Sequence, residues 1–198
     1  LTGGIDTVVS SITSYALGIN VENLILSGSA ISGTGNALNN YLEGNALANT
    51  LNGSTGVDTM VGGDGNDSFY VDTAGDAVIE NNAVLLTGGR DTVFSSIASY
   101  SLTANVEDLT LTGSATTGIG NNLANLIVGE SASGNYLNGG SGADTMIGGD
   151  GNDTYYVDSV GDLATETNAV LGTGGLDTVV SPLASYTLSA NIEHLILG

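Results

Sequence analysis

Apolar residues recur along this chain at every ninth position, and each follows a polar residue by two places. In the first copy of the pattern the apolar residues are Leu42, Leu51, Met60, Phe69 and Val78. The polar residues are Asn40, Asn49, Asp58, Asp67 and Asp76. An amphipathic helix needs an apolar residue every three to four positions, so this period excludes one. We predict one short strand and one glycine-rich turn per nonamer, with the apolar residues in the core.

A longer repeat contains the nonamers. Residues 3–8 return as residues 88–93 and again as residues 174–179, so the period is 85 residues and then 86. The additional residue lies between Gly129 and Asn138. Self-similarity of this kind is typical of repeat architectures.

The long repeat predicts how the chain is organised. We expect one long repeat at 1–85, a second at 86–171 and the start of a third at 172–198, in one continuous solenoid. Both ends fall inside a repeat, so we expect the chain to continue in tandem into further repeats.

Stacking of the nonamers brings carboxylates together. If one nonamer is half a coil, residues eighteen positions apart lie in neighbouring coils at about 4.8 Å. Asp58 then lies over Asp76, and Asp67 lies over Asn49. Carboxylates stacked this closely in a partly buried turn repel each other by several kcal/mol. The pattern therefore predicts a cation between successive turns.

The composition agrees with a bound cation. The sequence has 21 acidic residues and one basic residue, Arg90, which give a formal net charge of −20. With 41% hydrophobic residues and a mean hydropathy of +0.22, the chain is too apolar for an acidic disordered tail. A surface this negative repels nucleic acids and acidic membranes, which excludes both as partners.

The residue types select the kind of cation. The chain has no Cys and only one His, which argues against disulfides and against zinc or other transition metals. Carboxylates, Asn side chains and the carbonyls of 31 Gly supply oxygen, and Ca²⁺ accepts six to eight oxygen ligands. No apolar run is long enough for a transmembrane segment, and no N-terminal signal pattern is present.

Two pairs of adjacent nonamers carry a specific motif. Residues 53–70 read GSTGVDTMV and GGDGNDSFY, and residues 139–156 read GGSGADTMI and GGDGNDTYY. They resemble the Gly-Gly-x-Gly-x-Asp-x-apolar-x repeat of RTX (hemolysin-type) calcium-binding proteins. The resemblance implies an all-β fold, a right-handed parallel β-roll (β-solenoid) with calcium between stacked Gly/Asp-rich turns. It also implies export of the unfolded chain by type I secretion, and hence a secreted, extracellular or cell-surface location.

The resemblance further implies which residues bind Ca²⁺. In the family, the Asp at the sixth position and the carbonyl groups of the turn hold the ion, which places calcium blocks at about 53–80 and 139–166. In the first block the implied ligands are Gly53, Thr55, Gly56, Asp58, Gly62, Asp64, Gly65, Asp67, Val71, Thr73 and Asp76. In the second block they are Gly139, Ser141, Gly142, Asp144, Gly148, Asp150, Gly151, Asp153, Val157, Ser159 and Asp162.

Acidic residues also flank each join between the long repeats. They are Glu80 with Asp91 at the first join and Glu166 with Asp177 at the second. A further calcium site at each join is our hypothesis.

Upstream turns depart from the motif. The turns at 35–40 and 44–49 have Asn at the sixth position. Neutral Asn can hydrogen-bond across coils without a counter-ion, so we predict metal-free coils here. The side-chain oxygens of Asn49 and Asn135 could still reach the site beneath them.

The stretch before these turns predicts more solenoid without metal. Alternating apolar residues from Tyr15 to Val21 predict a strand. We interpret Glu22 and its copies, Glu107 and Glu193, as structural polar contacts. The single His194 is unrepeated and no insertion forms a cleft, so the sequence predicts no enzyme activity.

Together these features predict a calcium-binding β-roll segment of a large secreted or cell-surface RTX protein. It would be a structural or adhesive module that folds on binding extracellular calcium. One alternative is a self-assembling extracellular filament or surface-layer subunit, with self-association as the partner contact. Another is the secretion and folding tail of an RTX enzyme whose catalytic domain lies elsewhere.

Overall fold

The structure is a computed structural model that describes residues 3–84, 88–130, 134–168, 170 and 173–198. The chain forms two compact units, Leu1–Phe94 and Ser95–Gly198. Every regular element in the described residues is a β-strand, in keeping with the high cost of Gly in helices. Among these residues, no helix is long and apolar enough to cross a membrane.

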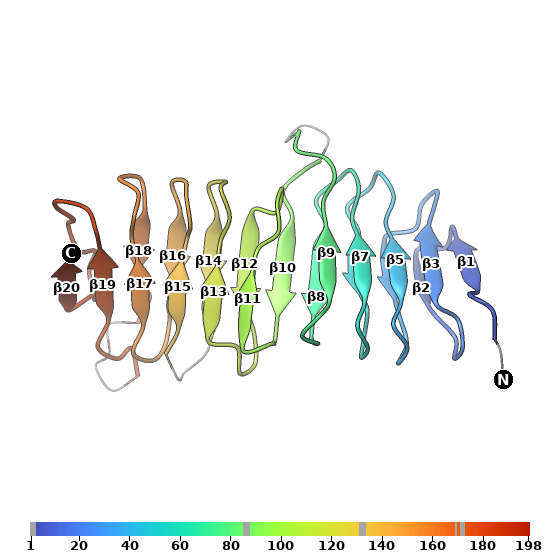
Figure 1. Ribbon diagram of the computed structural model, residues 1–198, viewed down its shortest axis with the longest axis horizontal. Helices are drawn as coiled ribbons and strands as arrows, with labels where there is room; N and C mark the ends of the chain where they lie inside the picture. Colours follow the sequence, from blue (N-terminus) through green and yellow to red (C-terminus); the bar gives the residue numbers. More distant parts are fainter. Residues whose placement is uncertain (1–2, 85–87, 131–133, 169, 171–172) are drawn as a thin grey trace. The chain divides into compact units, whose positions relative to one another are not determined.

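The first unit consists of two parallel sheets whose strands alternate along the chain (Figure 1). One sheet has the order β1-β3-β5-β7-β9, and β2, β4, β6 and β8 are successive neighbours in the other. Two strands and the two turns between them therefore make one coil. The strands are β1 Thr7–Ser10, β2 Ser14–Ala16, β3 Asn23–Leu26, β4 Ser32–Thr34, β5 Tyr41–Glu43, β6 Thr50–Asn52, β7 Thr59–Val61, β8 Ser68–Val71 and β9 Ala77–Ile79.

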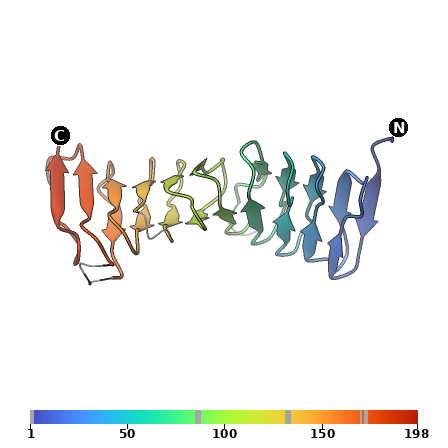
Figure 2. The same ribbon diagram turned by 90° about the horizontal axis from the view of Figure 1, so that it is seen from below.

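The second unit repeats this arrangement, and the stacked strands of its two sheets are visible in Figure 2. One sheet contains β12, β14, β16 and β18 as neighbours, and the other has the order β11-β13-β15-β17-β19-β20. The strands are β11 Ser99–Ser101, β12 Asp108–Leu111, β13 Thr117–Ile119, β14 Leu126–Val128, β15 Tyr136–Asn138, β16 Thr145–Ile147, β17 Thr154–Tyr156, β18 Leu163–Thr165, β19 Thr178–Ser181 and β20 His194–Leu197. Strand β10, Thr92–Ser95, includes the boundary between the units.

Strand pairing confirms the stacking predicted from the nonamers. Leu42 pairs with Met60, and Met60 pairs with Val78, each eighteen residues further on. Leu51 pairs with Phe69 in the other sheet. All five side chains are buried, so the apolar residue of each nonamer forms the core. The fold is an all-β parallel β-solenoid, as predicted.

Some coils are longer than eighteen residues. Gly118 pairs with Leu137, nineteen residues on, which accommodates the additional residue in the second repeat. Tyr155 pairs with Val179, 24 residues on, because a longer link follows β18. In the first unit Asp67 and Asp91, which directly precede β8 and β10, are likewise 24 residues apart.

The single strand predicted from Tyr15 to Val21 is wrong. Strand β2 ends at Ala16, Ile19 is 87% exposed, and Asn20 has a φ of 64°. Asn tolerates this left-handed conformation better than most residues, so the chain turns where the apolar alternation suggested extension. The solenoid nevertheless continues through this region, as expected.

Candidate metal centres

Each acidic turn lies directly before a strand, which places its last residue at one edge of the solenoid. Asp58 precedes β7 and Asp76 precedes β9, which belong to the same sheet. Asp67 precedes β8 of the other sheet. Turns that lead into one sheet stack as its strands do. Each unit therefore has two edges, each with its own ladder of turns.

Carboxylates tie the turns together along the first edge. The backbone N–H of Asn40 donates to Oδ1 of Asp58 at 2.7 Å, and the N–H of Asp58 donates to Oδ1 of Asp76 at 3.0 Å. These bonds confirm that Asp58 lies over Asp76. The same ladder in the second unit is formed by Asn125, Asp144 and Asp162.

The other edge has an equivalent ladder with a longer last step. The N–H of Asn49 donates to Oδ1 of Asp67 at 2.7 Å, which confirms that these residues stack. The N–H of Asp67 donates to Oδ1 of Asp91, also at 2.7 Å, although Asp91 is 24 residues away. The ladder in the second unit is formed by Asn135, Asp153 and Asp177.

Some of these turns are closed by the side chain of their own last residue. Oδ1 of Asn40 accepts a hydrogen bond from the N–H of Asn36 at 2.7 Å. Oδ2 of Asp76 accepts from the N–H groups of Asp72 and Thr73 at 3.2 and 3.1 Å. Both oxygens of Asp76 are thus hydrogen-bonded. The matching turn of the second unit contains Asp158, Ser159 and Asp162.

The four glycine-rich motif turns are different, and we call them open turns. Each ends in a buried Asp whose Oδ2 accepts no hydrogen bond from the described residues. These are Asp58, Asp67, Asp144 and Asp153. A buried carboxylate oxygen without a donor is unfavourable unless a cation compensates for it.

Glycine makes room for these oxygens. A methyl group at Gly53 would overlap the carboxylate of Asp58, and one at Gly139 would overlap that of Asp144. Gly56 has a φ of 136°, which residues with a Cβ rarely adopt. The motif glycines therefore keep the backbone of the turn close to the carboxylate.

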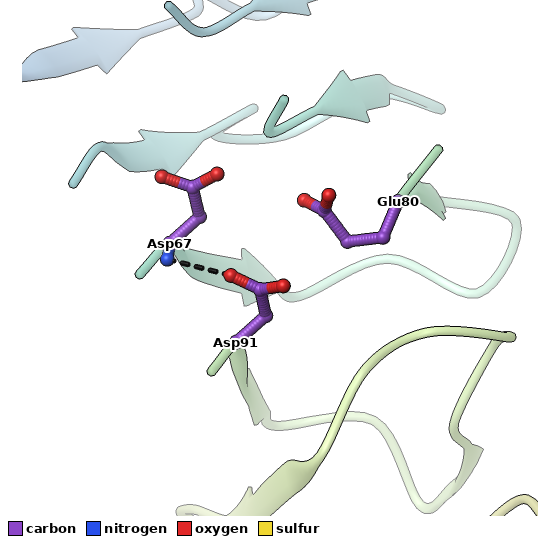
Figure 3. A group of neighbouring side chains, drawn as sticks. All are labelled: Asp67, Glu80 and Asp91. Atoms are coloured by element: carbon purple, nitrogen blue, oxygen red, sulfur yellow. Dashed lines mark hydrogen bonds between the residues drawn. The ribbon is translucent and has the colours of Figure 1, made fainter. Parts of the chain in front are cut away.

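Three carboxylates converge at the end of each calcium block. Figure 3 shows Asp67, Glu80 and Asp91 approaching from three separate segments. Each offers an oxygen within 4.8 Å of those of the other two, and all three residues are buried. The second unit has the same group, formed by Asp153, Glu166 and Asp177. We call these two groups the carboxylate trios; they unite the acidic residues of each join with one motif Asp.

Burial makes these carboxylates difficult to ionise. It raises the pKa of Asp58 to about 6, with a further increase from the charges of Asp76 and Asp72, against the opposing effect of the hydrogen bond from Asn40. Burial likewise raises the pKa of Asp67 to about 6. In the second unit burial raises the pKa values of Asp144 and Asp153 to about 6 and of Glu166 to about 7.

The oxygens of the open turns and the trios fit a hard divalent cation. They are buried and belong to acidic side chains that lie in or beside glycine-rich turns. Ca²⁺ accepts many oxygen ligands in irregular geometry, whereas Mg²⁺ demands near-ideal octahedra. The donor set contains no sulfur or imidazole, which transition metals prefer. This chemistry favours Ca²⁺.

The other predicted ligands have varied surroundings. The side chain of Asp64 is exposed and accepts a hydrogen bond from Asn82 at 2.6 Å. Asp150 accepts one from Asn168 at the same distance. Val71 and Val157 are buried, and Thr73 and Ser159 lie in closed turns. The remaining predicted ligands lie within the open turns and are Gly53, Thr55, Gly56, Gly62, Gly65, Gly139, Ser141, Gly142, Gly148 and Gly151. Coordination by these residues stays a prediction.

Two further polar groups can be placed. Oδ1 of Asn49 accepts a hydrogen bond from the N–H of Asn45 at 2.6 Å and so closes its own turn. In contrast, no described residue donates a hydrogen bond to the buried Oδ1 of Asn135.

Glu22 accepts a hydrogen bond from the N–H of Asp6 at 2.9 Å. This is a structural polar contact, as interpreted from the sequence.

Sequence reasoning missed one polar group at the second trio. The hydroxyl of Tyr155 donates a hydrogen bond to Oε1 of Glu166. The corresponding residue of the first unit is Phe69. The Phe-to-Tyr difference between two otherwise similar nonamers was the available signal, but burial alone explains an aromatic residue at a core position.

Comparison with known families bears on the same residues. The model of the RTX calcium-binding nonapeptide repeat (4 copies) matches residues 34–70, 118–155 and 131–163. These matches include all four open turns. No curated protein and no solved structure matches the chain. The chain therefore carries RTX calcium-binding nonapeptide repeats in a parallel β-roll, and Ca²⁺ is the ion that such repeats bind.

Proposed function

We propose that this chain is a calcium-dependent structural module of a large secreted or cell-surface protein, and that it folds when it meets extracellular Ca²⁺. The proposal assigns it no catalytic role. Its support comes from the match to RTX repeats, whose proteins are typically secreted, and from the open turns.

The observation that carries the proposal is the set of buried Oδ2 atoms in the open turns. Asp58 and Asp144 have no exposed surface, yet neither Oδ2 accepts a hydrogen bond from the described residues. Without a cation, folding brings these charges out of water and next to other carboxylates. Binding of Ca²⁺ offsets that cost, so the free energy of binding becomes free energy of folding.

The net charge acts in the same direction. A chain of −20 repels itself when compact, so low calcium favours the expanded state. An unfolded chain suits export, and calcium outside the cell then drives folding. Long repeats at 1–85, 86–171 and 172–198 suit a structural or adhesive module, because a solenoid lengthens by adding repeats.

Small-angle scattering with and without calcium tests the proposal. In excess chelator we expect a radius of gyration near that of an unfolded chain of this length, about 48 Å. Calcium should reduce it to less than half, and Mg²⁺ at the same concentration should not. A compact chain in chelator would contradict the proposal.

The recurrence of the same strands in both units favours a second candidate, self-assembly into an extracellular filament or surface layer. Strands β1 to β9 recur as β10 to β18, and repeats that match each other offer matching surfaces. Electron microscopy with and without calcium tests this candidate, which requires ordered filaments or sheets in calcium alone. A secretion tail of an enzyme would instead require a non-repetitive catalytic domain in the full-length sequence.

A further inference from the structure

The last step of one ladder in each unit differs from all the others, because the stacked Asp residues are 24 positions apart. The link between Asp67 and Asp91 contributes a third carboxylate, Glu80. We propose that each carboxylate trio is a calcium site of its own, and that the aromatic residue beside it, Phe69 or Tyr155, makes the first trio the tighter site. This inference rests on the proposed function and deepens it.

The first trio contains a buried carboxylate oxygen to which no described residue donates a hydrogen bond, which indicates that the trio needs a ligand. Asp67 is 1% exposed, and its Oδ2 accepts no hydrogen bond from the described residues. An oxygen of this side chain lies within 4.8 Å of an oxygen of Glu80 and of Asp91, and Figure 3 shows the three residues together. Charges of one sign in so dry a place are stabilised by a metal or by protons.

The surrounding backbone is shaped to the trio. A methyl group at Gly62 would overlap the carboxylates of Glu80 and Asp67 and the ring of Phe69. At Gly148 it would overlap the carboxylates of Asp153 and Glu166. Carboxylate oxygens thus occupy the space beside both glycines, as expected for a site assembled around an ion.

The second unit contains the same trio, which independently supports a calcium site at this place. The second trio, Asp153, Glu166 and Asp177, has the sequence spacing of the first, 13 and 11 residues. Asp153 is also 1% exposed, and its Oδ2 accepts no hydrogen bond from the described residues. In both units, the acidic residue that follows the long link therefore lies beside the other two carboxylates of the trio.

The second trio has a hydroxyl contact that the first trio cannot make. In the second, the hydroxyl of Tyr155 donates to Oε1 of Glu166, and the N–H of Gly149 donates to Oε2 at 3.1 Å. Phe69 has no hydroxyl and cannot make the first of these bonds. An ion in the second trio must therefore compete with Tyr155 for Glu166. When the ion binds, the hydroxyl of Tyr155 can donate its hydrogen bond to the carbonyl of Thr165, 3.1 Å away, instead.

This competition sets the expected difference in affinity. Because Ca²⁺ must displace this charge-assisted hydrogen bond, we expect the first trio to bind Ca²⁺ about tenfold more tightly than the second. Exchange of the two aromatic side chains should reverse the order. Tyr155→Phe should tighten the second site, and Phe69→Tyr should weaken the first, each by about tenfold.

The test uses the whole chain folded in calcium. Equilibrium dialysis should show one ion fewer for Glu80→Gln and one fewer for Glu166→Gln, while Glu43→Gln, outside both trios, should lose none. Circular dichroism of each variant should still respond to calcium through the open turns at Asp58 and Asp144. Unchanged ion counts in both trio variants, with that response intact, would overturn this inference and leave the proposed function standing.

Terbium provides a second readout that is specific to Tyr155. Light absorbed by a tyrosine beside a bound Tb³⁺ sensitises the ion's emission. We expect emission to fall in Tyr155→Phe and in Glu166→Gln but not in Glu80→Gln, and to rise in Phe69→Tyr. Equal emission from the unmodified chain and Tyr155→Phe, or equal affinities of the two trios, would overturn the assigned role of the aromatic residue. If neither calcium nor terbium changes the structure of the unmodified chain, the proposed function itself fails.

Discussion

The backbone N–H of Asn40 donates to Oδ1 of Asp58, eighteen residues away, at 2.7 Å. Oδ2 of the same buried carboxylate accepts no hydrogen bond from the described residues. The two oxygens therefore have different roles. Oδ1 ties one coil to the next, and Oδ2 remains for a cation. Asn could perform the first role without charge, but it would bind a cation poorly.

Asp58→Asn separates the two roles. The variant keeps an oxygen for the ladder but loses the charge, so we expect calcium affinity at this turn to fall at least about tenfold, which corresponds to about 1.4 kcal/mol. Isothermal titration calorimetry measures the change. Asp6→Asn is the control, since it removes the same charge at an exposed residue. Equal losses in both variants would mean that only net charge matters.

Gly62→Ala tests the steric requirement of the first trio. The new methyl would overlap the carboxylates of Asp67 and Glu80, and overpacking of this kind costs about 1–3 kcal/mol. Calcium affinity should fall about 5- to 150-fold. Gly18→Ala is the matched control, because nothing lies within 4 Å of the added carbon. Wild-type affinity in Gly62→Ala would contradict the description of this site.

Ser54→Gly should stabilise the calcium-bound fold. Ser54 has a φ of 64°, whereas the equivalent residue of the second unit is Gly140, with a φ of 78°. A left-handed residue with a Cβ costs about 1–2 kcal/mol, so we expect Ser54→Gly to gain about 1 kcal/mol and Gly140→Ser to lose as much. Urea denaturation in saturating calcium measures both. A loss of stability in Ser54→Gly would show that the Ser side chain, not the backbone, matters here.

Acid should partly replace calcium. The pKa of Asp58, Asp67, Asp144 and Asp153 rises on folding from 3.8 to about 6, chiefly through burial. The folded state therefore binds protons more tightly than the unfolded state. This stabilisation of the metal-free fold is complete below pH 3.8 and is lost as the pH rises through about 6.

In calcium-free buffer we expect more β-structure at pH 5 than at pH 8, as measured by circular dichroism. In calcium, the same acidification should weaken ion binding, because protons and Ca²⁺ compete for the carboxylates. A metal-free chain that unfolds further between pH 8 and pH 5 would contradict the assigned burial of these groups.

The sequence predicts the core and the stacking well, for a physical reason. One apolar residue per nonamer leaves a single way to bury Leu51 over Phe69, and this fixes the register of eighteen. The positions of the open turns follow as well, because Asp58 and Asp67 must then lie at the coil edges. The nine-residue period alone predicts the core, the register and the positions of the open turns.

Periodicity does not show which way a backbone N–H points. Asp76 occupies the same place in its nonamer as Asp58, yet both of its oxygens are hydrogen-bonded, because the N–H groups of Asp72 and Thr73 point inward. In the open turn, the N–H of Ser54 donates instead to Oδ1 of Asn52 at 2.7 Å. The difference arises from the φ angles of the turn, which the nine-residue pattern does not contain.

The carboxylate trios are a second feature that the sequence pattern does not predict. Glu80 and Asp91 were paired from their positions at a join, but nothing in the sequence shows that the link returns both side chains to Asp67. That convergence is a three-dimensional contact that the nonamer pattern does not specify. The hydroxyl of Tyr155 was missed for a related reason, since nothing in the sequence shows that the residue after β18, Glu166, lies against this ring.

Circular dichroism during a calcium titration, starting from excess chelator at neutral pH, tests the central claim most directly. We expect a largely unfolded spectrum without calcium, a cooperative change to β-structure as calcium is added, and reversal on adding chelator. A chain that is already fully β-structured in chelator and does not respond to calcium would contradict the account.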